Sequence, residues 1–547
     1  MGRLNDGFNI LYLGVVAAVY FKPDYAIKHS RTITIALFFT IITVSKLIYQ
    51  FFLYPRYFTP LRQIPTPSAR HWLKGNTASG LVDTPHELIK EWATTIPNDG
   101  LLRYYIVGQI ERLVLTNPKA LSEVLNSKVY DFAKPTIAQQ NLRRVVGDGV
   151  LLAEGDEHKA SHMIFQRKNL MPAFSYRHIK DLYPIFWNKS TEMAKLIRRE
   201  VKSRGPNEDS CITVRTYASR ATLDIIGLAG MGHDFDSLQN PNNRLYKSYQ
   251  KIFTSPGTFT RILFTIGLIL GDMRLIHKLP TARNKSFAEG RYVIRETARQ
   301  MLRAKQAEED EKKDTGIDII SVAMRSGNFE EENLLDQLMT FLAAGHETTA
   351  GALQWAVYAL CKNPDVQERL REEVRTNLPS INVENPEPID AAAIDNLHYL
   401  NAVCNEVLRF HPSVPNTVRV ALKDTSLVGQ PIPKGTWLVI SAELLNHMSE
   451  LWGPDADKFN PDRWMGPGKA NTGGATSNYA FLSFLHGPRA CIGQGFSKAE
   501  LACLLAALVG SFKFELKYPD AKLELKVGAT CSPKDGVQAL FTPLDGW

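Results

Sequence analysis

The sequence predicts a mainly α-helical protein with smaller β-sheets, because its strongest patterns have the period of a helix. Two long stretches, Asn333–Lys362 and Gly495–Val509, repeat apolar residues every three or four positions. The clearest strand-like runs, Leu101–Val107 and Glu111–Leu115, are short and flank Gly108 as the arms of a hairpin would. Near the N-terminus, one apolar stretch is long enough to cross a membrane. These observations predict a helical body behind a membrane anchor.

The composition is that of a folded globular protein. Of the 547 residues, 44% are hydrophobic and 22% are charged, so the chain can bury a sizeable core. The net charge of +8 is spread without a basic block, and no nucleic-acid motif occurs, so we expect a membrane surface or an acidic protein as partner. The six cysteines lack C-x-x-C pairing, which indicates neither a zinc site nor a disulfide framework. We therefore expect the catalytic body to face a reducing compartment.

The chain is expected to consist of an anchor at 1–54, a hinge at 55–70 and a catalytic domain at 71–547. Within the anchor, Thr32–Tyr54 carries a single charge and exceeds the roughly 20 apolar residues that span a bilayer. Phe8–Phe21 is shorter, so it is a second span, a signal-like segment or an interfacial helix, and no cleavage site follows it. The hinge has a proline every few residues, which predicts stiff, extended backbone.

One cysteine follows a turn-prone run and precedes the second long helix. The segment Phe484–Gly493 reads FLHGPRACIG and places Cys491 at the helix N-terminus. Unpaired N–H groups and the helix dipole favour a thiolate there, and a thiolate is a metal ligand. Gly487 and Gly493 would let a flat cofactor approach the backbone, while Arg489 could meet an anionic group of that cofactor. Taken alone, such a cysteine is as often a small buried hydrophobe.

A polar interruption lies in the middle of the first long helix, where the sequence reads AGHETT. Glu347 and Thr348 put polar groups at positions that a core helix ordinarily avoids, and Ala344 and Gly345 thin the helix beside them. In isolation, a threonine bonded back to a carbonyl and a surface glutamate would explain the same residues. Because Glu347 and Thr348 lie in the middle of a long apolar helix, the alternative interpretation is that they belong to a functional site.

A later predicted helix, Tyr399–Phe410, carries Glu406 and Arg409 on one face, where they can pair. Exposed pairs of this kind contribute little to stability, so the pair alone says little. Downstream, the segment FNPDRW supplies Arg463.

Together these motifs resemble those of the cytochrome P450 family. The family patterns are F-x-x-G-x-R-x-C-x-G, matched at Phe484–Gly493, A-G-x-[DE]-T-T, matched around Thr348, E-x-x-R, and a later F-x-P-x-R-[FW]. All four occur in the family's order over roughly Leu101–Phe541. The resemblance implies the cytochrome P450 fold, with haem b held between the long helix and the cysteine loop and the Cys491 thiolate as axial iron ligand. The details are similar to fungal microsomal members that act on secondary metabolites.

The resemblance also implies a role for each matching residue. Thr348 would help deliver protons to oxygen, with Glu347 in the same relay. A buried network behind the cysteine loop, structural rather than catalytic, would comprise Glu406, Arg409 and Arg463. The residues that would contact haem are Phe484, Gly487, Arg489, Cys491, Gly493, Arg419, Arg167 and His158.

The segment Glu154–Phe174 departs from the family pattern. His158 stands where the family has a tryptophan, four residues before an arginine, but Ala160–Ile164 separates it from Arg167. Five residues rotate a helix by about 500°, which is about 140° past a full turn. His158 and Arg167 would therefore leave their shared face. We interpret Ala160–Ile164 as an insertion, and Arg167 as the safer ligand of a haem propionate.

The activity implied by the resemblance is oxidation of a lipophilic small molecule with O2, in fungal terpenoid or polyketide-type metabolism. Electrons would come from an NADPH-cytochrome reductase, with cytochrome b5 as a second donor, since no flavin or nicotinamide motif occurs. The expected location is the endoplasmic reticulum membrane, with the catalytic domain facing the cytosol. A haem-thiolate isomerase or dehydratase that consumes no O2 and a non-enzymatic haem sensor are the alternatives; the Glu347–Thr348 pair argues against the isomerase or dehydratase.

The apolar stretch Phe259–Leu270 is too short to span a bilayer. It is either a core helix or, by the same resemblance, the roof of a substrate entrance that dips into the membrane.

Overall fold

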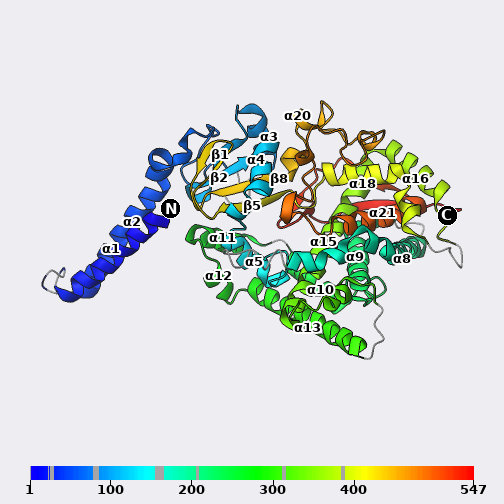
Figure 1. Cartoon of the computed structure of the whole chain (residues 1–547), viewed down its shortest axis with the longest axis horizontal. Coiled ribbons are helices and arrows are strands. Elements are labelled where there is room, and N and C mark those ends of the chain that lie inside the picture. The colour runs from blue at the N-terminus through cyan, green and yellow to red at the C-terminus, as the bar shows by residue number, and fades with distance from the viewer. Residues whose placement is uncertain are drawn as a thin grey trace. The chain divides into compact units, whose positions relative to one another are not determined.

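The computed structural model of the chain is mainly helical with small sheets, which confirms the predicted fold class (Figure 1). It describes residues 2–22, 24, 27, 30–77, 86–153, 166–204, 209–254, 256–310, 316–382 and 389–547. The two predicted long helices are present as α15, Glu331–Lys362, and α21, Gln494–Ser511. Their apolar periodicity located both helices to within a few residues.

The chain divides into two compact units. Unit 1 comprises Met1–Pro135, Arg261–Asp272 and Thr417–Leu444, and unit 2 comprises Thr136–Thr260, Met273–Asn416 and Leu445–Trp547. Each unit is built from segments far apart in the sequence, so neither follows a simple linear boundary. We describe each unit by itself.

Unit 1 contains a five-stranded sheet around the predicted hairpin. In the hairpin Ile106 pairs with Ile110, and Gly108 turns the chain with a positive φ of 76°. The next pairing along the sheet, β2 with β8, is parallel. The strand order is β1-β2-β8-β5-β3, with bounds Leu101–Ile106, Ile110–Leu115, Trp437–Ser441, Asn416–Ala421 and Phe132–Ala133.

The N-terminal part of unit 1 is a pair of packed helices. Helix α1, Gly2–Phe21, runs beside α2, Arg31–Ile48 (Figure 1). The Tyr12 hydroxyl lies 2.8 Å from Thr43 Oγ1, which holds the two helices together. Within the described residues, one continuous helix, Arg31–Phe58, is long and apolar enough to cross a membrane. It contains the predicted span Thr32–Tyr54 and ends in a π-type helix.

The predicted hinge is held against the hairpin. The π-type helix η3, Tyr49–Phe58, continues past Pro55, and the 3-10 helix η4, Pro60–Gln63, follows it. The extended backbone therefore begins at Ile64, later than predicted. The Thr59 hydroxyl donates to the Glu111 carboxylate at 3.1 Å, and the backbone N–H of Arg103 donates to the Pro65 carbonyl at 2.8 Å. Contacts with β1 and β2 therefore add to the stiffness that the prolines confer.

Unit 2 is organised around α15, which packs against several helices. Its main neighbours are α9, α21, α5 and α18, and α8 packs against both α9 and α21. The bounds of these neighbours are Val214–Met231 (α9), Thr136–Val146 (α5), His398–Phe410 (α18) and Tyr183–Ser203 (α8). A three-stranded sheet, β4-β12-β9, is formed by Cys211–Thr213, Gln538–Pro543 and Phe512–Leu516.

The remaining elements are shorter or peripheral. The other helices are α3 His86–Thr95, α4 Pro118–Ser122, α7 Tyr176–Ile179, α10 Arg244–Phe253, α11 Thr258–Leu270, α12 Arg274–Lys278, α13 Ala282–Asp310, α14 Ile319–Arg325, α16 Pro364–Asn377, α17 Ala391–Asp395, α19 Ala442–Leu445 and α20 Ser449–Trp452. The two-stranded sheets pair Thr425–Leu427 (β6) with Gln430–Ile432 (β7), and Leu525–Val527 (β10) with Cys531–Pro533 (β11).

Candidate active site

The cysteine loop is closed by a backbone hydrogen bond between its ends. The N–H of Cys491 donates to the carbonyl of Phe484 at 2.8 Å. Between them the chain turns through Leu485 and Gly487, which have positive φ values of 57° and 74°. Glycine adopts that conformation without strain, so Gly487 is required by the turn itself. The loop therefore presents Cys491 from a backbone that is fixed at both ends.

Cys491 lies two residues before Gly493, the N-cap of α21. Although the residue keeps an exposed surface, the surrounding protein desolvates its thiol and raises its pKa. The backbone N–H of Gly493 and the charge of Arg167 oppose this by lowering the pKa. The helix end favours the thiolate, as the sequence predicts, but desolvation has the larger effect and the net pKa of the thiol is raised. A bound metal ion would displace the thiol proton, since metals bind the deprotonated form.

Arg167 lies at the cysteine loop. Its Nη1 donates to the carbonyl oxygen of Ala490 at 2.7 Å, next to the cysteine. Burial lowers the pKa of Arg167, and the neighbouring Cys491 raises it. In this position the guanidinium supports the loop directly, besides the role toward a propionate that the family pattern implies. The other predicted basic residue of that segment, His158, and the stretch Ala160–Ile164 lie outside the described residues.

The two remaining predicted arginines occupy different parts of the chain. Arg489 is half-buried in the short helical turn Gly487–Arg489 of the cysteine loop. Arg419 belongs to unit 1, where it is buried on β5. Its Nη1 donates to Thr417 Oγ1 at 3.1 Å and to the Val418 carbonyl at 2.8 Å.

The cysteine loop fits a flat prosthetic group. Gly493 has an ordinary negative φ, and a Cβ built there would come no closer than 3.9 Å to Phe174. Neither the backbone nor the described neighbours therefore require glycine, and the bare backbone beside Cys491 suits close approach of a planar ligand. No cluster of three or more His, Cys, Asp or Glu that could hold a metal occurs among the described residues. The iron of haem carries further ligands from the porphyrin, so a single cysteine from the protein suits it.

The polar interruption of α15 lies at its predicted place. Thr348 Oγ1 donates to the Ala344 carbonyl at 2.8 Å, which is the back-bonded arrangement weighed as the structural alternative. The Thr348 carbonyl accepts a hydrogen bond from Ser413 Oγ at 2.9 Å. Glu347 is not at the surface: its side chain is 12% exposed and its Oε1 lies 3.8 Å from Nζ of Lys526.

The small residue Gly345 serves helix packing. A Cβ on Gly345 would come within 2.8 Å of Ile226 Cγ1 on α9. The thinning of the helix at Gly345 therefore lets α9 pack closely against α15.

Glu406, Arg409 and Arg463 come together in one buried network. Both carboxylate oxygens of Glu406 accept from Arg409, at 2.7 and 2.8 Å, and Arg463 Nε donates to Glu406 Oε1 at 3.1 Å. Trp464 Nε1 adds a 2.9 Å bond to Glu406 Oε2. Because Glu406 and Arg409 are fully buried, each charge depends on these partners.

Asn446 connects this network to the segment before the cysteine loop. Its carbonyl oxygen accepts from Arg409 at 2.6 Å, and its side-chain amide donates to the Arg409 carbonyl and to Ser483 Oγ, both at 2.9 Å. Its Oδ1 accepts from the N–H of Leu482 at 2.9 Å. Sequence reasoning missed Asn446, Ser413 and Lys526, because none belongs to a motif and each lies far along the chain from its partner.

Comparison with known proteins places the chain among fungal enzymes. The sequence profile of the family described as Cytochrome P450 matches residues 65–538. Cytochrome P450 monooxygenase sphH of Aspergillus fumigatus is 65% identical, with 100% of both chains covered. Cytochrome P450 monooxygenase FSL4 of Gibberella zeae is 41% identical over 92% of each chain, and FUM15 of Gibberella moniliformis is 39% identical over 93% of each.

Proposed function

The chain belongs to the cytochrome P450 family, as a haem-thiolate monooxygenase, and from this premise we propose which of its residues carry the reaction, where it acts and on what. When bound, haem supplies the iron centre at which O2 is activated with two electrons and two protons, so that one oxygen atom enters the substrate. The observation that carries the assignment is the closed loop that presents Cys491 beside the bare backbone of Gly493.

Cys491 would hold the haem iron through its thiolate, and the loop would keep the cysteine in place. Arg167 holds the loop through the Ala490 carbonyl and lowers the cost of the thiolate by its positive charge. Phe484 and Gly487 set the course of the loop, and Arg489 and Arg419 are the cationic partners for the haem carboxylates. The network of Glu406, Arg409 and Arg463 is structural: through Asn446 it fixes the segment that leads into the loop.

Thr348 and Glu347 handle protons. The Thr348 hydroxyl holds a proton at Oγ1, bonded to the Ala344 carbonyl, and passes it on by rotating about its side-chain bond. Glu347, largely buried beside Lys526, is the group that replaces that proton. Ser413 steadies the backbone at Thr348 through its hydrogen bond to the carbonyl there.

The enzyme needs a redox partner and a small-molecule substrate, as P450 monooxygenases do. We propose that the partner is an NADPH-cytochrome reductase, with cytochrome b5 as a second donor. The substrate we propose is a lipophilic secondary metabolite of the terpenoid or polyketide type. The apolar helix Arg31–Phe58 supports an anchor in the endoplasmic reticulum membrane, with the catalytic part facing the cytosol.

The test of the haem ligand is the absorbance of the reduced carbon monoxide complex. Cys491→Ser should lose the shifted band that a thiolate ligand produces, while Cys211→Ser, a half-buried cysteine on β4, should keep it. A band that survives Cys491→Ser would remove Cys491 as ligand. Reductase-dependent O2 consumption with a lipophilic substrate separates the monooxygenase from an isomerase or sensor. Comparing the metabolites of a gene-deletion strain with those of its parent, by mass spectrometry, would supply the substrate.

A further inference from the structure

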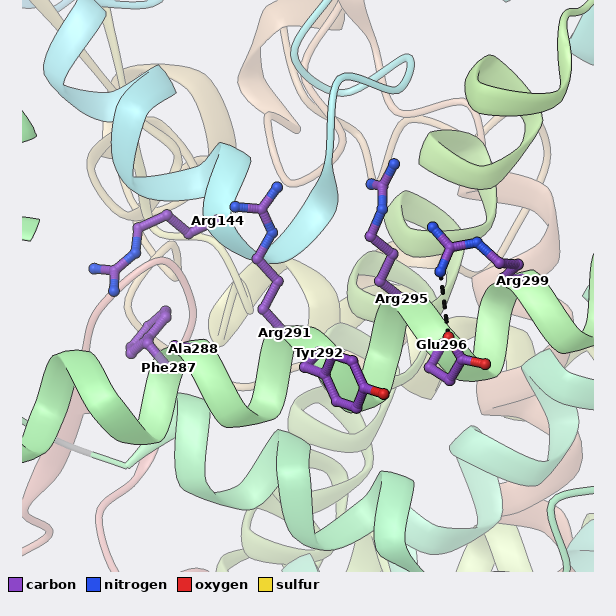
Figure 2. Close-up of a pocket in the computed structure, with 8 residues that line it drawn as sticks. All are labelled: Arg144, Phe287, Ala288, Arg291, Tyr292, Arg295, Glu296 and Arg299. Atoms are coloured by element: carbon purple, nitrogen blue, oxygen red, sulfur yellow. Dashed lines mark hydrogen bonds and ion pairs between the residues drawn. The ribbon is translucent and has the colours of Figure 1, made fainter.

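Arginines gather around one phenylalanine of α13, outside the site described above. The guanidinium carbons of Arg144 on α5 and Arg283 on α13 lie 4.5 and 4.7 Å from the centre of the Phe287 ring. Arg291 is close enough to affect the titration of Arg144. Figure 2 shows Arg291 and Arg295 extending from the same side of α13, with Arg144 beside them above Phe287. Positive charge is thus concentrated on one short stretch of surface.

Most of this charge lacks a counterion. Arg295 pairs with Glu332 and, at 3.2 Å, with Asp336, and Arg299 pairs with Glu296 at 3.2 Å. In the described part of the chain, no carboxylate pairs with Arg144, Arg283 or Arg291. Burial lowers the pKa of Arg144, and the charges of Arg283 and Arg291 lower it further. An anion placed beside Arg144 and Arg291 would relieve that repulsion.

The guanidinium groups of Arg144 and Arg283 are held in place by uncharged hydrogen-bond partners. Arg144 donates to Asn284 Oδ1 at 3.2 Å, while Arg283 donates to the carbonyls of Lys251 and Ile252 at 2.9 and 2.6 Å. These bonds orient the groups without neutralising their charge, so little side-chain entropy remains to be lost when a ligand binds. Arg144 and Arg283 are therefore held in place before any ligand arrives.

The groove is a cavity of about 340 Å³ that Arg144, Arg291, Arg295 and Tyr292 help to line. The carboxylate of Glu296 also lines it and is paired with Arg299 at 3.2 Å. The planar N–H forks of arginine match the paired oxygens of a phosphate group. We propose that this groove binds a phosphate group, either on the headgroup of an anionic membrane lipid or as free phosphate. Inorganic phosphate and a lipid phosphate share the chemistry that Arg144 and Arg291 would recognise.

The surroundings of the groove favour the lipid as the source. Asn284, which positions Arg144, also donates to the carbonyls of Ile276 and Leu279 at 2.8 and 3.0 Å. Beside them, Leu275 and Leu279 are 69% and 40% exposed. Exposed apolar side chains next to cationic ones are typical of surfaces that contact anionic lipid, because the two can engage acyl chains and headgroups together.

The test uses the full chain in detergent and isothermal titration calorimetry. The probes are a short-chain phosphatidic acid, a short-chain phosphatidylcholine and inorganic phosphate. We expect Arg144→Gln with Arg291→Gln to weaken binding of phosphatidic acid about tenfold or more, since the variant removes two charged hydrogen-bond donors to the phosphate. The matched control, Arg143→Gln with Lys285→Gln, removes the same charge from the same two helices outside the groove and should change binding less than about twofold.

Each outcome bears on the proposal. The proposal is supported if phosphatidic acid binding is lost in the Arg144→Gln/Arg291→Gln variant and kept in the control variant. It is overturned if that variant binds as tightly as the wild type, or if the control variant loses binding equally. If Leu275→Ser weakens the binding of phosphatidic acid but not of inorganic phosphate, the ligand is a lipid. If the wild-type protein binds phosphatidic acid and inorganic phosphate with equal affinity, the ligand is free phosphate. If the double variant does not fold, the single variant Arg291→Gln is titrated in its place. Among the described residues Arg291 has no carboxylate partner, so this substitution leaves no buried charge unpaired.

Discussion

Nζ of Lys526 lies 3.8 Å from Oε1 of Glu347, and the two side chains are only 10% and 12% exposed. Lys526 comes from β10, about 180 residues along the chain from α15. Burial lowers the pKa of Lys526, Glu347 raises it, and Arg215 and Arg283 lower it. The carboxylate that we propose as the proton source thus has a buried ammonium as its neighbour, and that ammonium titrates more readily than a surface lysine.

We expect Lys526→Gln to reduce the rate of product formation several-fold while leaving the carbon monoxide band unchanged. Because the pKa of Lys526 is lowered, wild-type turnover should fall as the pH rises through that pKa and the positive charge disappears. The variant should lack this alkaline decline, and Lys526→Arg should restore part of the rate. Product formation measured against pH checks this; parallel profiles for the variant and the wild type would exclude a role for Lys526.

Thr348→Ala should divert electrons from product to hydrogen peroxide, because the hydroxyl that we propose as a proton carrier is gone. Within the described part of the chain the hydroxyl bonds to the Ala344 carbonyl of its own helix, so stability should change little. The ratio of peroxide formed to NADPH consumed is the measurement. Thr348→Ser keeps the hydroxyl and is the matched control; unchanged coupling in the alanine variant would remove Thr348 from proton delivery.

Glu406→Ala should lower the free energy of unfolding by about 3–5 kcal/mol, because it takes the carboxylate partner from the fully buried Arg409, whereas Arg463 keeps its pair with Asp455 at 2.9 Å. Haem loading should fall with it, since the same network fixes the segment before the cysteine loop. The exposed pair of Arg369 and Asp462 is the control, and Asp462→Asn should cost less than about 1 kcal/mol. Denaturant midpoints and haem content of both variants test the difference.

Glu500 on α21 should make the folded protein less stable as the pH rises. Its carboxyl is fully buried, and burial raises its pKa well above the ordinary value, against the opposing effect of the Thr349 hydroxyl. The folded state therefore keeps this proton at pH values where the unfolded state releases it. The stability that the proton contributes is complete below the ordinary glutamate pKa and is lost as the pH rises through the raised pKa.

Glu500→Gln should remove this part of the pH dependence, because the amide cannot ionise. Denaturant unfolding between about pH 5 and pH 8 should show a flatter stability profile for the variant and higher stability at the alkaline end. A slope equal to that of the wild type would mean that Glu500 titrates normally in the folded protein.

The sequence predicted the elements whose patterns are local. Apolar periodicity located α15 and α21 because each helix must bury one continuous face, and the short runs around Gly108 located the β1–β2 hairpin. The cysteine motif could also be recognised from local sequence, because the turn requires glycine at Gly487 and the apolar helix α21 follows the motif directly. Glu406 and Arg409 were found because they lie three residues apart on one helix.

The tertiary structure decided what these residues contact. Burial, which depends on the whole fold, raises the pKa of Cys491 although its helix end favours the thiolate. Ile226 fills the space beside Gly345, and Asn446 joins Arg409 to the cysteine loop across segments that no local pattern connects. The sequence by itself therefore determined the family and the long helices and supplied Cys491 as the proposed haem ligand, because those rest on local spacing. Ion pairs, desolvation and the cationic groove on α13 arise only when distant segments pack together.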